Sequence, residues 1–206
     1  MANLSADTDQ EYFADGMTDL LITQLGQIAA LQVISRTSAM QLKGVKKPLP
    51  EIAKQLGVDA VVTGSVMRSG GRVRINAELV DGATDNQLWS KIYQRELTDV
   101  LTLQGEVAQA IATEIRAKVT PQEAGRLSRV HTIAPAALDA YLRGRYYWSL
   151  YEPEPLVKSV ESYEEPVRLD PSYADAFAGM AMSLTGLHYV GAQPFEEIIL
   201  KARETE

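Results

Sequence analysis

A strict alternation of apolar and polar residues between Arg72 and Val80 constrains the fold of this chain more than any other feature. Period-two alternation predicts a strand in a sheet with one buried face and one solvent-exposed face. The positions predicted to be buried are Val73, Ile75, Ala77 and Leu79. Turn clusters at 69–71 and 81–86 predict that this strand is the middle one of three antiparallel strands, at 59–68, 72–80 and 87–95.

Helical periodicity is found on both sides of this meander. The first predicted helix covers 13–30, with its regular part beginning at Thr18, because Gly16 is unfavourable inside a helix. The second is a long helix whose predicted buried stripe is Val100, Leu103, Val107, Ile111, Ile115 and Val119. Between the first helix and the meander we expect a short strand over 31–35, a loop over 39–49, and a helix over 51–56 that Gly57 ends.

The character of the sequence changes between residues 120 and 135, where Pro121, Gly125 and Pro135 interrupt it. Strand patterns disappear beyond this point, and the remaining residues are aromatic and helical in pattern. The predicted fold is therefore an α/β (α+β) sandwich with a mixed sheet, followed by an all-α helical segment. We place the first domain at 1–122 and the helical segment at 133–206.

Several short motifs between residues 3 and 119 keep the order and spacing of one known family. They include Asn3-Leu4-Ser5, the segments 10–19, 33–38 and 52–58, and Gln87-Leu88-Trp89-Ser90. On these motifs the first domain resembles the TolB amino-terminal-like family. The resemblance implies a module of bacterial signalling proteins, commonly joined to class III adenylate cyclases or winged-helix regulators. The sequence contains neither a cyclase segment nor a winged-helix segment, so neither activity is carried over.

The helical segment resembles a tetratricopeptide (TPR) array. Four residues match positions in the second helix of a repeat and the turn after it, namely Ser159, Tyr163, Pro166 and Pro171. The first helix is matched by Leu142, Arg143, Gly144 and Tyr147, and a second repeat begins with Phe177, Met180, Ala181 and Leu184. The chain ends at Glu206, inside the predicted closing helix of that repeat. Because proline inside a helix costs about 3 kcal/mol, we expect the helix over 158–169 to kink or end at Pro166.

Stacked helical repeats build a concave face that can hold an extended peptide or a partner helix. The candidate residues for such a groove are Tyr141, Arg145, Tyr147 and Trp148. Sealing the joint between the two domains is the alternative role for these side chains. The leading hypothesis is a non-catalytic protein–protein interaction or signalling module with a protein or peptide partner, and no catalytic residue is assigned.

We also expect a homo-oligomer. Members of the resembled family carry an apolar strand before the Asn3 motif, where this sequence has only Met1 and Ala2. A sheet that lacks a strand exposes unpaired backbone groups, which recruit another chain.

Two other functions compete with this hypothesis. A weak serine ester hydrolase would use Ser35, Ser38 or Ser65, with His131 or His188 as the base, although no G-x-S-x-G motif is present. A small-molecule sensor would hold its ligand between the two domains.

Composition argues against several other classes of protein. Cysteine is absent, and the acidic trio Asp7, Asp9 and Glu11 lacks the glycine of a calcium loop, so we expect no metal and no cofactor. A net charge of -7 argues against nucleic acid as a partner. No apolar run is long enough to cross a bilayer and no signal peptide is recognisable, so we expect no membrane insertion and a soluble protein, in the cytoplasm rather than the periplasm.

Overall fold

The computed structural model describes residues 1–5, 11–128 and 133–194. The chain divides into two compact units, Met1–Thr132 (unit 1) and Ile133–Glu206 (unit 2). Each unit has buried apolar side chains of its own, so each is held together by its own core.

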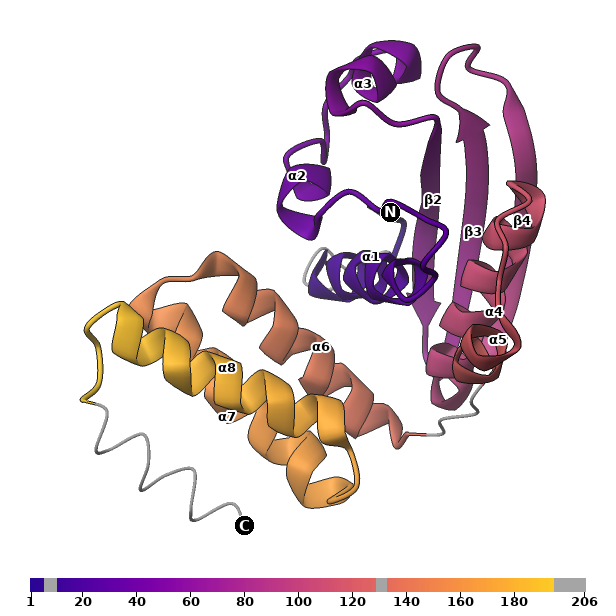
Figure 1. Cartoon of the computed structure of the whole chain (residues 1–206). Coiled ribbons are helices and arrows are strands. Elements are labelled where there is room, and N and C mark those ends of the chain that lie inside the picture. The colour runs from indigo at the N-terminus through magenta and orange to yellow at the C-terminus, as the bar shows by residue number, and fades with distance from the viewer. Residues whose placement is uncertain (6–10, 129–132, 195–206) are drawn as a thin grey trace. The chain divides into compact units, whose positions relative to one another are not determined.

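Unit 1 is built on a four-stranded sheet in the order β1-β2-β3-β4 (Figure 1). β1 (Ala2–Asn3) runs parallel to β2 (Ala60–Ser69), and β2, β3 (Arg72–Asp81) and β4 (Gln87–Glu96) form an antiparallel meander. The predicted mixed sheet is confirmed. The alternation in the central strand predicted one buried face, and the four apolar residues on that face are buried, namely Val73, Ile75, Ala77 and Leu79.

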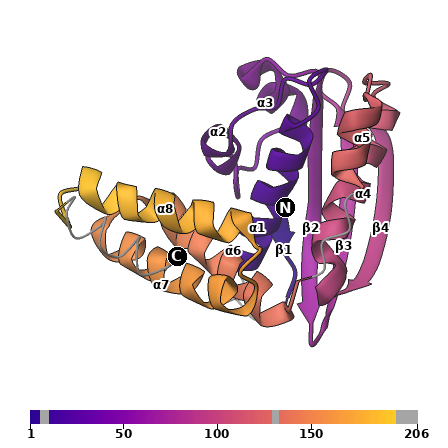
Figure 2. The same ribbon diagram turned by 60° about the horizontal axis from the view of Figure 1, so that its bottom comes forward.

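Two helices form the second layer of the sandwich. α1 (Glu11–Gly26) and α4 (Val100–Glu114) contact each other and the sheet, and a short 3-10 turn, η2 (Leu97–Asp99), leads into α4 (Figure 2). Inside this layer the Gln104 side-chain amide donates to the carbonyl of Met17 at 3.3 Å. Because a buried amide is stable only when its hydrogen bonds are satisfied, this contact fixes α1 against α4.

The first helix differs from its prediction at both ends. α1 begins at Glu11, includes Gly16 as a buried residue and ends at Gly26. Thr18 is not the helix N-cap, and its hydroxyl instead donates to the carbonyl of Ala14 at 2.8 Å inside the helix. Tertiary packing therefore overrides the weak intrinsic penalty of a glycine in a helix.

The predicted strand over 31–35 is wrong. These residues have no strand structure, and Ser35 instead caps α2 (Arg36–Met40), whose last residues fall in the predicted loop. An apolar run becomes a strand only when a neighbouring strand takes its hydrogen bonds, and in the described part of the chain β1 holds that edge of the sheet. α3 (Leu49–Leu56) forms as expected, and Gly57 ends it with φ at 66°.

The end of the long helix was also misplaced. α4 stops at Glu114, so the half-buried C-cap Ile115 and Val119 are not part of its buried stripe, and α5 (Pro121–Leu127) forms inside the predicted interruption. Thr120 and Glu123 make a capping box at its start. The Glu123 carboxylate accepts a further hydrogen bond from the backbone of Ala29 at 2.9 Å, which ties α5 to the loop after α1.

Unit 2 is entirely helical over its described residues, as predicted. It contains α6 (Pro135–Leu150), α7 (Pro153–Leu169) and α8 (Ala174–Tyr189), and each helix contacts the other two. Residues 195–206, which include the end of the predicted closing helix at Glu206, lie outside the described residues.

The predicted early end of the helix at Pro166 is wrong, because α7 continues to Leu169. Pro166 removes one backbone hydrogen bond because it has no N–H, but the turn after it still forms. The carbonyl of Pro166 still accepts from Asp170 at 2.9 Å.

Tyr163 of α7 is the centre of the core of unit 2. Its ring is 2% exposed and lies against Gly144 of α6 and Gly179 of α8, where a methyl group on either glycine would overlap the ring. The Ser159 hydroxyl donates to the carbonyl of Gly144 at 2.8 Å and lies 2.8 Å from the Ser183 hydroxyl. Small residues on the outer helices therefore allow three helices to close around one aromatic side chain.

Candidate functional site

The four residues predicted to form a partner groove all lie on α6, and the structure separates them into different environments. Tyr141 is 2% exposed and packs in the core, with its ring centroid 4.9 Å from that of Tyr173. Its hydroxyl accepts a hydrogen bond from Arg145 at 2.8 Å. Burial raises the pKa of the Tyr173 hydroxyl well above its usual value. The geometry therefore gives Tyr141 a packing role.

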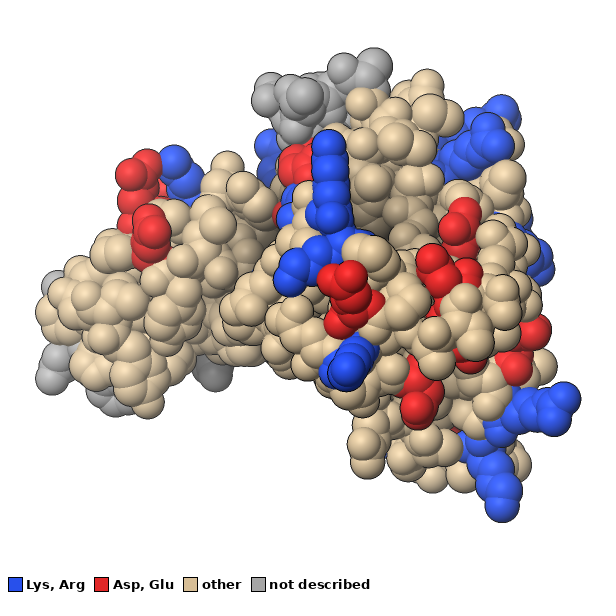
Figure 3. Space-filling view, turned by 90° about the horizontal axis from the view of Figure 1, so that it is seen from above, with Lys and Arg blue, Asp and Glu red and all other residues tan. Residues whose placement is uncertain are grey.

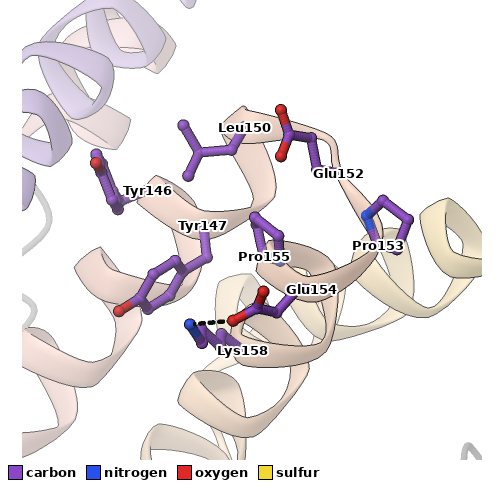
Figure 4. Close-up of a pocket in the computed structure, with 8 residues that line it drawn as sticks. All are labelled: Tyr146, Tyr147, Leu150, Glu152, Pro153, Glu154, Pro155 and Lys158. Atoms are coloured by element: carbon purple, nitrogen blue, oxygen red, sulfur yellow. Dashed lines mark hydrogen bonds and ion pairs between the residues drawn. The ribbon is translucent and has the colours of Figure 1, made fainter.

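Tyr147 has a different environment, because it lines an open pocket of about 600 Å³ at the end of α6 (Figure 4). Tyr146 and Leu150 of the same helix complete one wall, and the rings of Tyr146 and Tyr147 meet edge to face with centroids 5.6 Å apart. The opposite wall comes from the turn after α6 and the start of α7, namely Glu152, Pro153, Glu154, Pro155 and Lys158.

The charged side chains of the pocket are partly paired with each other. The Lys158 ammonium donates to Glu154 at 2.7 Å, which raises the pKa of Lys158 and lowers the pKa of Glu154. This is an i, i+4 pair on the exposed surface of a helix, a geometry that is only weakly stabilising. Glu152 makes no hydrogen bond or ion pair with the described residues.

Of the remaining predicted residues, Arg145 and Trp148 are half-buried on α6. The structure pairs Arg145 with Tyr141, and it places Tyr147 beside Tyr146, which the prediction did not include. Tyr146, Glu152 and Lys158 were missed as pocket residues. The signal that could have found them is Pro153-Glu154-Pro155, which marks a helix start directly after the aromatic run.

Unit 1 carries a compact group of charges between α1, the first residue of α2 and the segment after α2. Lys43 contacts Asp15 at 2.6 Å and Glu11 at 2.5 Å, and Arg36 lies 3.6 Å from Asp19. Partial burial would lower the pKa of Lys43, but its hydrogen bonds to the two acids raise it, and the same lysine lowers the pKa of Glu11. These acids are therefore satisfied by cations of the chain itself.

Of the acidic trio that was rejected as a calcium loop, Asp7 and Asp9 lie outside the described residues. Glu11 of that trio is bound to Lys43. Among the residues that the structure describes, no group of three or more acidic or histidine side chains is arranged to hold a metal ion.

The serines considered for hydrolysis lie in unit 1. Ser35 caps α2 by accepting from the backbone of Ser38 at 3.3 Å, and Ser65 is part of β2. His131 lies outside the described residues, and the described part of unit 1 contains no histidine. His188 belongs to α8 in unit 2. Within unit 1 the described residues therefore show no serine–histidine pair.

Two surface features bear on partners. On the face shown in Figure 3, basic side chains are interspersed with acidic ones, and the coloured residues form no continuous basic patch. Of the helices within the described ranges, none combines the length and apolar character needed to cross a membrane.

Comparison with known proteins gives one clear similarity. The chain is 34% identical over 180 residues to a protein of Rhizobium meliloti (strain 1021) named "Putative adenylate cyclase 3". The match covers 87% of this chain, but the chain spans only 31% of that relative. No family model matches the sequence.

The solved structures that match include one with low sequence identity. It is the lipoprotein GNA1162 from Neisseria meningitidis, which is 19% identical, covers 58% of this chain and 94% of its own, and superposes with a TM-score of 0.37.

Proposed function

We propose that this chain is a non-catalytic interaction and signalling module that serves as an accessory part of a bacterial adenylate cyclase or transcriptional regulator. The similarity to the Rhizobium relative carries this proposal, because it extends over most of the chain while covering less than a third of a protein named as a cyclase. The remaining two thirds of that relative leave room for a catalytic domain elsewhere.

In this proposal residues 1–122 are a TolB amino-terminal-like domain. The two-layer arrangement of unit 1 and the order of its motifs along β2, β3 and β4 support this assignment. Residues 133–206 are TPR-like repeats. Support comes from the antiparallel helices of unit 2 and from Gly144, Ser159 and Tyr163, which meet in its core at the positions where the TPR resemblance places them.

The absence of catalysis can be tested on the full chain in two assays. Incubation with ATP and a divalent cation should produce no cyclic AMP, and a fluorophosphonate probe should label no serine stoichiometrically. Cyclic AMP formation above a heat-denatured control would contradict the proposal. So would labelling of Ser35, Ser38 or Ser65 that disappears in the matching alanine variant.

Self-association is part of the same proposal. β1 pairs with only Ser65 and Val66 of the ten residues of β2, with Leu4 and Ser5 adding one bond each. The opposite edge of the sheet is β4, which carries Lys91 and charged residues near its end. Its ladder with β3 also has a register shift. Charged side chains and irregular pairing both discourage another chain from pairing with an edge strand. We therefore expect light scattering to report a dimer or larger species at micromolar concentration. A monomer mass throughout would contradict this part.

A further inference from the structure

The pocket between α6 and α7 combines aromatic walls with carboxylates. Tyr146 and Tyr147 supply ring surface, and Leu150, which is 45% exposed, supplies an aliphatic wall. Pro153 and Pro155 stiffen the opposite side, because proline fixes its own φ. The backbone on that side of the pocket is therefore already restricted, which reduces the entropy lost on binding.

The charged side chains that line the pocket favour a positively charged ligand. Two glutamates and one lysine line it, and the lysine is already neutralised by Glu154 at 2.7 Å. This leaves Glu152 with no partner in the described part of the chain. An anionic ligand would meet an excess of negative charge, whereas a cation would find both a free carboxylate and the negative faces of two tyrosine rings.

We propose that this pocket binds the cationic side chain of a lysine or arginine from a partner protein. The methylene stem of that side chain lies against Tyr147 and Leu150, as long basic side chains do on apolar surfaces. Its charged group lies near Glu152, which is on the Leu150 side of the pocket in Figure 4. The inference rests on the proposed function as an interaction module, and it names the chemistry of the partner.

The overall charge agrees with this assignment. The chain carries a net charge of -7, so its field attracts basic partners and speeds their encounter. Positively charged residues on the partner then supply specificity once the two proteins are in contact.

The test is an NMR titration of the full chain with three small probes of similar shape. Butylguanidinium is the cation, butylurea its neutral counterpart and butyrate the anion. We expect saturable shifts at residues 146–158 with butylguanidinium, and binding roughly fivefold tighter than that of butylurea. Butyrate should produce no saturable shift there.

Two variants and one control locate the interaction. Glu152→Gln removes the free carboxylate without changing the size of the side chain, and Tyr147→Leu removes the ring but keeps an apolar wall. Each should reduce the preference for the cation to about twofold or less. The control is Glu114→Gln, at an exposed residue of α4 in unit 1, which should leave the preference unchanged.

Equal affinity for the cation and the urea, or shifts that survive both substitutions, would overturn the proposal. Tighter binding of butyrate would also overturn it. These outcomes are separate from a failure of the proposed function, which would be seen as cyclic AMP formation or serine labelling and would not depend on this pocket.

Discussion

The two units of this protein differ in how far apart along the chain their internally bonded residues lie. In unit 1, Gln104 bonds to Met17 and Glu123 bonds to Ala29, so partners are 87 and 94 residues apart. In unit 2, the buried bonds of Ser159 reach residues only 15 and 24 positions away. Unit 1 must therefore form as a whole, whereas unit 2 is built from contacts between helices that are neighbours in the sequence.

The two tryptophans allow the units to be followed separately. Trp89 lies in β4 of unit 1 and Trp148 lies in α6 of unit 2. In variants that keep only one tryptophan, the fluorescence change on denaturation reports the unfolding of a single unit.

The largest expected effect is the loss of the ring at the centre of unit 2. Tyr163→Ala should reduce the free energy of unfolding reported by Trp148 by about 3–5 kcal/mol, because it leaves a large cavity between three helices. The signal of Trp89 should change little. Tyr189→Ala, at a residue 76% exposed, serves as the control. Equal destabilisation at both tryptophans would show that the two units unfold together.

A smaller effect is expected from filling the space beside that ring. Gly179→Ala should cost roughly 1–3 kcal/mol in urea unfolding followed by Trp148, because the added methyl group overlaps Tyr163. The matched control is Gly125→Ala in α5, where nothing lies within 4 Å of the new methyl group. That change should stabilise unit 1 by about 0.5–1 kcal/mol, since alanine favours a helix. Stabilisation by both substitutions would contradict the packing described for Tyr163.

Unit 1 should respond instead to the loss of its capping box. Thr120→Ala removes the side-chain oxygen that accepts from the backbone of Glu123 and should cost about 1 kcal/mol, measured through Trp89. Thr113→Ala, whose hydroxyl only donates to a carbonyl within α4, is the control. An unchanged transition midpoint would mean that α5 contributes nothing to the stability of unit 1.

The pH dependence of unit 1 follows from the same glutamate. Hydrogen bonds from Ala29 and Thr120 lower the pKa of Glu123 from 4.5 to about 2. Because the folded pKa lies below the unfolded one, the stabilising contribution is complete above about pH 4.5 and is lost as the pH falls towards 2. In the Glu123→Gln variant, the free energy of unfolding reported by Trp89 should decrease less between pH 4.5 and pH 2 than it does in the unmodified protein. Glu161→Gln in unit 2 should leave it unchanged.

The meander and the helical segment were predictable because their signals are local. The alternation around Val73 and Ile75 and the glycine at 57 each specify their own structure. The predicted strand over 31–35 and the predicted helical position of Val119 were wrong because these features depend on residues that are distant in the sequence. Whether an apolar run pairs as a strand, or where a helix stops, depends on neighbours that sequence periodicity does not reveal.

The candidate site could be predicted only in part for a similar reason. Aromatic residues on α6 were recognisable as a group, but periodicity did not separate the buried Tyr141 from Tyr147 in the pocket. Glu152 and Lys158 belong to the next turn and helix, and they reach the pocket only because α7 folds back along α6.

The proposal that α6 presents a partner-binding surface is tested most directly by site-specific photocrosslinking in cells. A benzoylphenylalanine placed at Tyr147 in the full chain should give an adduct of defined mass, which should disappear in the presence of excess unlabelled chain. The same group placed at Ile92, which is 55% exposed in unit 1, should not give that adduct. The same adducts from both positions, or none from Tyr147, would contradict the proposal.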